Sequence, residues 1–408
     1  MIGVLDRLEA KGLIQRERDC KDRRLVQVSL TEPGKRLVAN APSPLQGTLA
    51  EVLNALREPE RATIAESLER IVDMMEVGHI DVAPMLETGP IQPTTGDASG
   101  DAMSFDTVNE AKANFNDVYT APTPHAYIAS MAKNGYEIGE QARHYCAAAA
   151  ELLREHNGDV WPVQMLDVGC SYGIGAAIVK YGCSFDEMVA FFSSRAPSEY
   201  RAACEAMRMW LHITPPVCDM RVVGLDSSES AVRFAVDAGL LDGGIARDFE
   251  QTTVAPTEDE IAWFRSCNLL ISTGAIGYIT ERSLDVVLRH LGKDHPGGFG
   301  PFAVVTILRM FDSSPIETVF EEHGLTFGAV AGARLPQRRF ADVEERQKVL
   351  SLLDDRCIDT REWEREGKHY ADLFIAAPPQ QFSQLRERMR ETLSARESEP
   401  EGVGYIRR

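Results

Sequence analysis

The chain of 408 residues has room for about two or three domains of 100–200 residues each. Hydrophobic residues make up 44% and charged residues 26%, which are globular proportions and exclude collagen-like, mucin-like or wholly disordered chains. The formal net charge is −19, and residues 91–408 carry −16 of it, so this large part is expected to repel nucleic acid.

The N-terminal stretch MIGVLDRLEAKG carries charges where a signal peptide needs an apolar segment, and no window of about 18 consecutive apolar residues occurs. We therefore expect a cytoplasmic protein with no membrane segment. The eight cysteines include no C-x-x-C pair. Their spacing predicts neither a disulfide framework nor a metal site.

The first residues predict a short helix followed by a charged hairpin. Ile2, Leu5 and Leu8 recur at helical spacing, and Gly12 stands where a helix C-cap is expected. Residues 13–18 then precede a polar turn, after which RRLVQVSL alternates apolar and polar residues as a half-buried strand does.

This order, with its Asp-x-x-Asp-Arg-Arg turn and Leu-Thr-x-x-Gly motif, resembles the end of the recognition helix and the wing of MarR-type winged-helix regulators. The resemblance implies that Arg23 and Arg24 lie against DNA. It covers only part of that fold, because Met1 falls inside the recognition helix. DNA binding is therefore expected to be weak and without sequence preference, since base readout needs a supported helix in the major groove.

Residues 45–56 and 64–75 each repeat apolar side chains at helical spacing, which predicts two amphipathic helices. In MarR-type proteins such helices form the dimer interface, so a homodimer is one interpretation and packing within one chain is the other. We expect residues 1–77 to form a partial winged helix with these helices. Residues 78–102, with three prolines and four glycines in 78–101, are predicted to be a linker.

Residues 103–159 predict helices that form a lid, and residues 160–380 alternate strands and helices, which is typical of an α/β domain. The segment VQMLDVGCSYGIG combines a buried strand, a glycine-bearing turn and the start of a helix. Its D-x-G-C-x-x-G form resembles the first motif of class I S-adenosylmethionine-dependent methyltransferases and fits a dinucleotide fingerprint poorly. The resemblance implies a Rossmann-like, seven-stranded domain that binds S-adenosylmethionine through the five residues Asp167, Gly169, Cys170, Ser171 and Gly173.

A second buried strand, RVVGLD, ends at Asp226 and is followed by Ser227. In the family that Asp167 and its turn resemble, the acidic residue at this strand end binds the ribose hydroxyls. The separation from Asp167 is longer than the family's usual one. We therefore expect an inserted helical segment at about 183–217, which serves as a substrate cap or an oligomer contact.

The resemblance also assigns Asp248 and Phe249 to the adenine, and places Ser272, Thr273 and Gly274 beside the transferable methyl group. Further strands are predicted in the segments GPFAVVTILRMFD, LTFGAVAGARL and HYADLFIAAPP. Residues 381–408 are expected to be a charged tail that begins as a helix.

Methyl transfer needs little acid–base machinery because alignment of nucleophile, methyl and sulfur gives much of the rate. His125, Tyr127, His144 and Tyr278 are candidates for a base by location only, and a structural role is the alternative for each histidine. The N-P-P-[YFW] signature of adenine and glutamine methyltransferases is absent, since STGAIGY stands in its place. A small-molecule acceptor is therefore predicted. The alternative function is a DNA-binding regulator in which the methyltransferase fold senses a ligand.

Overall fold

The computed structural model describes residues 11, 14–18, 26–31, 109, 116–157, 163–194, 199–251, 255–294 and 298–398. The chain divides into two compact units, Met1–Asp97 and Ala98–Arg408, and each is described by itself.

In the first unit, β1 (Ile14–Arg18) and β2 (Val26–Leu30) pair antiparallel, with Ile14 opposite Leu30. The predicted hairpin is thereby confirmed. Arg23 and Arg24 lie outside the described residues. The helices expected at 45–56 and 64–75, the linker at 78–102 and the last ten residues of the chain lie outside them as well.

The described part of the second unit contains one mixed sheet of seven strands in the order β5-β4-β3-β6-β7-β9-β8. Its strands are β3 (Val163–Val168), β4 (Met220–Asp226), β5 (Gly243–Ala246), β6 (Leu269–Ser272), β7 (Phe302–Leu308), β8 (Thr326–Arg339) and β9 (Lys368–Ala377). The pairs from β5 to β7 are parallel, whereas β9 is antiparallel to both β7 and β8. This arrangement is the Rossmann-like fold of class I S-adenosylmethionine-dependent methyltransferases, and the predicted fold class is confirmed.

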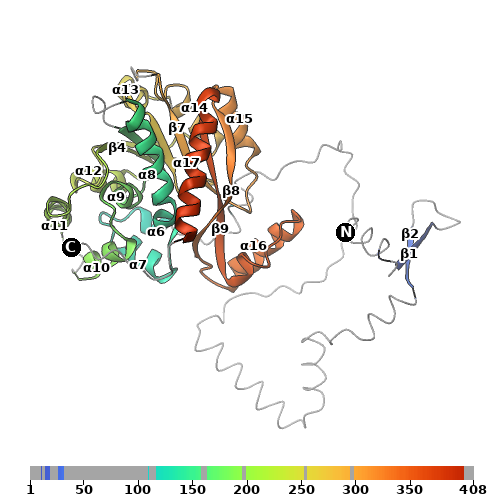
Figure 1. The fold of residues 1–408 in the computed structure, drawn as a ribbon. Helices are drawn as coiled ribbons and strands as arrows, with labels where there is room; N and C mark the ends of the chain where they lie inside the picture. Colours follow the sequence, from blue (N-terminus) through green and yellow to red (C-terminus); the bar gives the residue numbers. More distant parts are fainter. Residues whose placement is uncertain are drawn as a thin grey trace, which may run out of the picture. The chain divides into compact units, whose positions relative to one another are not determined.

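Helices cover both faces of this sheet (Figure 1). Before and between the first strands lie α6 (Asn116–Tyr119), α7 (His125–Lys133), α8 (Ile138–Asn157), α9 (Ile174–Tyr181), α10 (Phe185–Ser193), α11 (Tyr200–His212) and α12 (Glu229–Asp237). Later in the chain come α13 (Glu258–Ser266), α14 (Glu281–Leu288), α15 (Ser314–Glu322), α16 (Val343–Asp355), the 3-10 turn η1 (Glu364–Glu366) and α17 (Pro379–Ser398).

The helices α8, α9 and α17 share one face of the sheet, where α8 packs against both of the others. The right-handed crossovers between parallel strands determine which face each connecting helix covers. The chain steps outward in opposite directions on the two sides of β3, so α9 and α12 lie on the face opposite α14. The long helix α8 was expected to belong to a lid, but the structure places it in this layer. The tail expected from residue 381 begins inside α17, and Leu385 and Met389 of this helix are buried.

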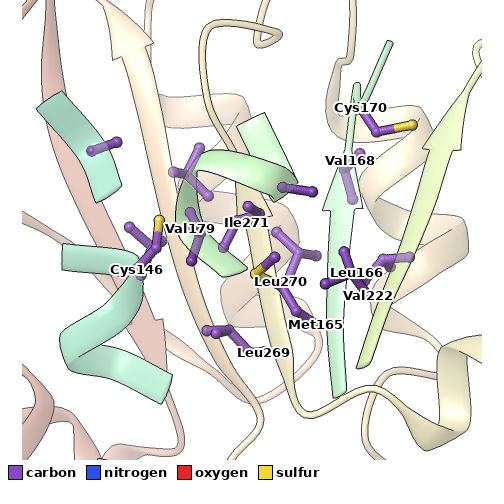
Figure 2. Close-up of a cluster of buried hydrophobic side chains, with 14 of the residues drawn as sticks. Cys146, Met165, Leu166, Val168, Cys170, Val179, Val222, Leu269, Leu270 and Ile271 are labelled. Atoms are coloured by element: carbon purple, nitrogen blue, oxygen red, sulfur yellow. The ribbon is translucent and has the colours of Figure 1, made fainter. Parts of the chain in front are cut away.

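The core lies between the sheet and these helices. Figure 2 shows Met165, Leu166 and Val168 of β3 beside Val222 of β4 and the neighbouring residues of β6. Every residue of β7 is buried, which is the pattern of a strand covered on both faces. In the described part of the chain, no helix combines the length and the apolar character that crossing a membrane requires.

The segment between α9 and β4, where an inserted helical region was predicted, contains α10 and α11. Ser184 begins α10 with a capping box, since its hydroxyl accepts from the Glu187 N–H and the Glu187 carboxylate accepts from the Ser184 N–H. The side chains of Cys204, Met207 and Leu211 form the buried stripe of α11. This stripe packs α11 against α12, on the side of β4 away from the centre of the sheet.

Candidate functional site

A cavity of about 460 Å³ opens at the carboxyl ends of the parallel strands. Ligands of open α/β sheets bind at this edge, where loops from neighbouring strands converge. Ten of the residues singled out from the sequence line the cavity: Tyr127, Gly169, Ser171, Asp226, Ser227, Asp248, Phe249, Thr273, Gly274 and Tyr278.

The turn after β3 is held tightly in place. Gly169 has φ +84°, and a Cβ there would lie 2.2 Å from the Cβ of Ala275, so no other residue fits. The backbone N–H of Gly169 donates to the carbonyl of Leu225 at 2.8 Å, which joins the turn to the end of β4. Gly173, with φ +73°, begins α9 and does not line the cavity.

Asp226 connects the turn to the next strand. One carboxylate oxygen accepts from the Ser171 N–H at 2.9 Å, and the other accepts from the Ser228 N–H at 2.9 Å. Burial raises the pKa of this carboxyl group, although these backbone donors act against the rise. The side chain therefore presents a fixed acceptor to the cavity.

Asp167 lies beneath the turn instead of in the cavity wall, and only 3% of it is exposed. Burial raises the pKa of this carboxyl group to about 7, and the nearby charge of Asp226 adds to the rise. A hydrogen bond from the Ala176 N–H opposes it. The charge at the end of β4 thus acts on the carboxyl group at the end of β3.

The remaining predicted cofactor residues are buried outside the cavity lining. Cys170 packs under Gly224, where an added Cβ would meet the sulfur at 2.5 Å. Ser272 is fully buried at the end of β6, and its hydroxyl has no hydrogen-bond partner.

Neither histidine proposed as a base lines the cavity. His125 shares a hydrogen bond of 3.1 Å with Thr123 and meets the ring of Phe192 edge-on, and burial lowers its pKa. His144 lies on α8 with its Nε2 3.3 Å from the guanidinium of Arg143. These contacts hold each imidazole among its neighbours in the protein, so a structural role explains both histidines.

The loop after β5 forms one end of the cavity. Asp248 accepts from the N–H of Glu250 at 3.1 Å and from the side chain of Gln251 at 2.8 Å. Glu250 in turn accepts hydrogen bonds from the backbone and hydroxyl of Thr280 and from the hydroxyl of Ser283. These bonds attach the β5 loop to the start of α14, so the two segments form one continuous part of the wall.

A short segment, residues 118–121, borders the cavity near the end of β4, and we call it the strap. The Tyr172 hydroxyl lies 3.0 Å from the carbonyl of Val118 and 2.7 Å from that of Ala121. Ser228 and Ser230 donate from the other side, to the carbonyls of Tyr119 at 2.6 Å and Thr120 at 3.0 Å. Tyr119 and Thr120 line the cavity, so the strap forms part of its wall.

Sequence reasoning missed the other end of the cavity. That wall contains Tyr119, Met131, Tyr136, Gln337 and Arg338. The tyrosines occur in an aromatic-rich stretch of the helical region, which was a usable signal. Gln337 and Arg338 follow Pro336, beyond the point where the strand was predicted to end.

No family model matches this sequence. Among solved structures, the TehB-like S-adenosylmethionine-dependent methyltransferase of Corynebacterium glutamicum is similar, with 14% identity and a TM-score of 0.27 over 56% of this chain and 86% of its own. The N-methyltransferase NodS of Bradyrhizobium japonicum has 14% identity and a TM-score of 0.28 over 59% and 97%. The [4+2]-cyclase SpnF has 14% identity and a TM-score of 0.28 over 56% and 79%. The fold is assigned from the strand order described above.

Proposed function

We propose that this chain binds S-adenosylmethionine in the cavity and transfers its methyl group to a small-molecule acceptor. The observation that carries the proposal is the position of Asp226, whose fixed carboxylate lines the cavity beside the glycine turn. A carboxylate at the end of this strand is placed to accept hydrogen bonds from ribose hydroxyls. In this proposal, Asp248 and Phe249, which line the cavity on the adjacent loop, flank the adenine.

Two buried polar atoms support a polar ligand in this cavity. The hydroxyl of Ser171 and the amide oxygen of Gln337 are buried without a hydrogen-bond partner in the protein, and both residues line the cavity. Buried polar atoms are almost always paired with protein or water. These two atoms, together with Gly169 at the cavity wall, fit a cofactor with hydroxyl, amino and carboxyl groups.

When bound, S-adenosylmethionine supplies a methyl group on a positively charged sulfur. The chain's part is to hold the acceptor in line with that methyl and to exclude water, which are effects of positioning. Thr273 and Gly274 after β6 lie between the Asp226 end and the Gln337 end of the cavity, and the Gly274 N–H is fixed by the hydroxyl of Thr306 at 2.9 Å.

The bases present at the wall are the carboxylates of Asp226, Asp248 and Glu250, and each already accepts hydrogen bonds from the protein. Among the described residues that line the cavity, none is a histidine, lysine or cysteine. Burial raises the pKa values of the phenols of Tyr127 and Tyr278, so both stay protonated at neutral pH and serve as hydrogen-bonding groups. We therefore expect the acceptor atom to be nucleophilic without deprotonation by the protein.

Calorimetric titration of the full chain with S-adenosylmethionine and S-adenosylhomocysteine tests the proposal. Saturable binding of both at one site per chain is expected, with adenosine weaker because it lacks the amino acid part. NAD is the control for a dinucleotide site and is expected not to bind. Wild-type protein that binds neither S-adenosyl compound would show the proposed function to be wrong.

A further inference from the structure

The charged side chains of the cavity wall are unevenly distributed. Its carboxylates, Asp226, Asp248 and Glu250, all follow β4 and β5, and Arg247 at this end is paired with Glu260 at 3.4 Å. The opposite half is formed by α7, the loop after β6 and the end of β8, and the strap, which is bonded to Ser228 and Ser230 after β4, joins the two halves. Among the described residues lining that half, Arg338 is the one charged residue.

An irregularity in β8 brings Arg338 to this wall together with Gln337. Successive residues of a regular strand face opposite sides of a sheet. Here Pro336 is opposite Tyr370 and Arg338 is opposite His369, so Gln337 is an extra residue in the register. Such bulges redirect side chains next to functional sites. Both Gln337 and Arg338 consequently line the cavity.

Arg338 is buried and fixed in orientation, with 4% of the residue exposed. Its two terminal nitrogens donate to the two oxygens of Glu345 at 2.9 and 2.6 Å. Glu345 also accepts from the Ala341 N–H at 2.6 Å and lies 3.2 Å from Nε2 of His369. Neither Glu345 nor His369 lines the cavity, so the positive member of this cluster is the one at the wall.

Tyr119 and Tyr278 line the same cavity as Arg338. Burial raises the pKa of both phenols, and at Tyr119 the charge of Asp226 adds to the rise, while the charge of Arg338 acts in the opposite direction on each. They remain neutral hydrogen-bond donors at physiological pH. A guanidinium beside neutral phenol donors is suited to an anionic oxygen group.

We propose that the methyl acceptor carries a carboxylate, and that this group binds beside Arg338 and the Tyr119 and Tyr278 hydroxyls. The proposal rests on the proposed function for the position of the cofactor. One guanidinium already shared with Glu345 suits a single negative charge better than a doubly charged phosphate. The side chains of Met131 and Ile279 and the tyrosine rings provide an apolar, aromatic surface for the rest of the acceptor.

The test compares ligands of one shape and different charge. Benzoate, benzamide, benzylamine and phenyl phosphate are titrated into the full chain at pH 7.5, with and without saturating S-adenosylhomocysteine, by ligand-observed NMR. We expect benzoate to bind at least about tenfold more tightly than the other three in both conditions. Benzamide binding equal to benzoate, or tighter binding of benzylamine or phenyl phosphate, would overturn the proposal.

Variants locate the benzoate site. Tyr278→Phe removes one donor and is expected to weaken benzoate binding about three- to tenfold, with benzamide unchanged. Tyr181→Phe, on α9 away from the cavity, is the matched control. Arg338 is removed together with Glu345, as the double variant Arg338→Met/Glu345→Met, because a lone buried charge would unfold the site.

The double variant is expected to lose the preference for benzoate over benzamide while it still binds S-adenosylhomocysteine. If the preference survives in a variant that binds S-adenosylhomocysteine normally, the carboxylate site lies elsewhere and the inference is wrong, although the proposed function stands. If the wild type binds no S-adenosyl compound, the proposed function fails, and the titrations without it still decide whether the anion site exists.

Discussion

The carboxylate of Asp226 accepts the backbone N–H of Ser171 at 2.9 Å, so one side chain both holds the turn after β3 and faces the cavity. Ser171 is a non-glycine residue with φ +47°, a conformation that needs support from its surroundings. Asp226 provides that support at the cavity wall. The two roles can be separated by substitution.

We predict that Asp226→Ala weakens S-adenosylhomocysteine binding by about 1–3 kcal/mol, because it leaves ligand hydroxyls and the Ser171 N–H without an acceptor. Asp226→Asn keeps one acceptor oxygen and should lose less. Asp219→Asn, an exposed residue at the start of β4, is the control and should bind as the wild type does. Equal affinity of the alanine variant and the wild type in calorimetry would contradict the assigned role.

A second prediction compares two glycines with similar backbone angles. Gly169 has φ +84° and a Cβ clash at 2.2 Å, whereas Gly324 has φ +78° and open space around it. Gly324→Ala should lower the free energy of unfolding by about 1–2 kcal/mol, from backbone strain alone. Gly169→Ala should cost at least about 2 kcal/mol more and abolish S-adenosylhomocysteine binding, because Ala275 must move.

Urea denaturation of the two variants, followed by far-UV circular dichroism, measures the difference. Equal losses of stability would mean that the turn can relax around an added methyl group. The steric role given to Gly169 would then be wrong.

The third prediction concerns pH. Burial and the charge of Asp226 raise the pKa of Asp167 to about 7, so a large fraction of this carboxyl group is protonated in the free protein at neutral pH. A bound cation favours the carboxylate and lowers that pKa, so binding releases a proton. Affinity for positively charged S-adenosylmethionine should therefore rise about tenfold from pH 6 to pH 8.

Calorimetry in buffers of different ionisation enthalpy measures the released proton directly. Neutral adenosine is the ligand control, and its affinity should change little over the same range. Asp167→Asn should flatten the S-adenosylmethionine profile. A steep profile that persists in this variant would assign the titration to another group.

The same shift affects folding. The pKa of Asp167 is raised in the folded state above its ordinary value of 3.8, so the unfolded chain loses this proton first. Stability is consequently lost as pH rises from about 4 to 7. Asp167→Asn should therefore stabilise the protein by more at pH 8 than at pH 4, as measured by thermal unfolding. An equal effect at both values would exclude this linkage.

The fifth prediction concerns the strap. Tyr172→Phe removes the hydroxyl that bonds to the carbonyls of Val118 and Ala121 and changes little else. The hydrogen bonds that hold the strap against the cavity are then weaker by about 1 kcal/mol. Dissociation of S-adenosylhomocysteine should therefore be about three- to tenfold faster. Stopped-flow displacement measures the rate, with Tyr181→Phe as the control. An unchanged rate would mean that the ligand leaves by another route.

The acidic ends of the strands could be predicted because each buried run stops at a polar residue. Asp226 ends such a run, Asp248 was expected from the resemblance, and both line the cavity. Asp167 occupies the same kind of position, yet it lies under the turn, because the side chain at a strand end faces one side or the other according to the pleat. Local pattern does not reveal which side carries the ligand.

The Arg338 end of the cavity could not be predicted from local pattern. Pro336 favours the end of a strand, but β8 is an edge strand, where a missing N–H is tolerated. The bulge that follows depends on pairing with β9, which comes later in the chain. The position of His144 outside the cavity likewise depends on how α8 packs in its layer.

The order of the last strands also affects how the chain folds while it is being translated. In the described sheet, β8 has β9 as its one neighbour, although β9 leaves the ribosome after it. The turn after β3 and its partner Asp226 can assemble while the later chain is still being translated, because domains tend to fold from the N-terminal side. Gln337 and Arg338 remain on an unpaired strand until Lys368–Ala377 emerges. A nascent chain can therefore hold the Asp226 half of the cavity well before the Arg338 half exists.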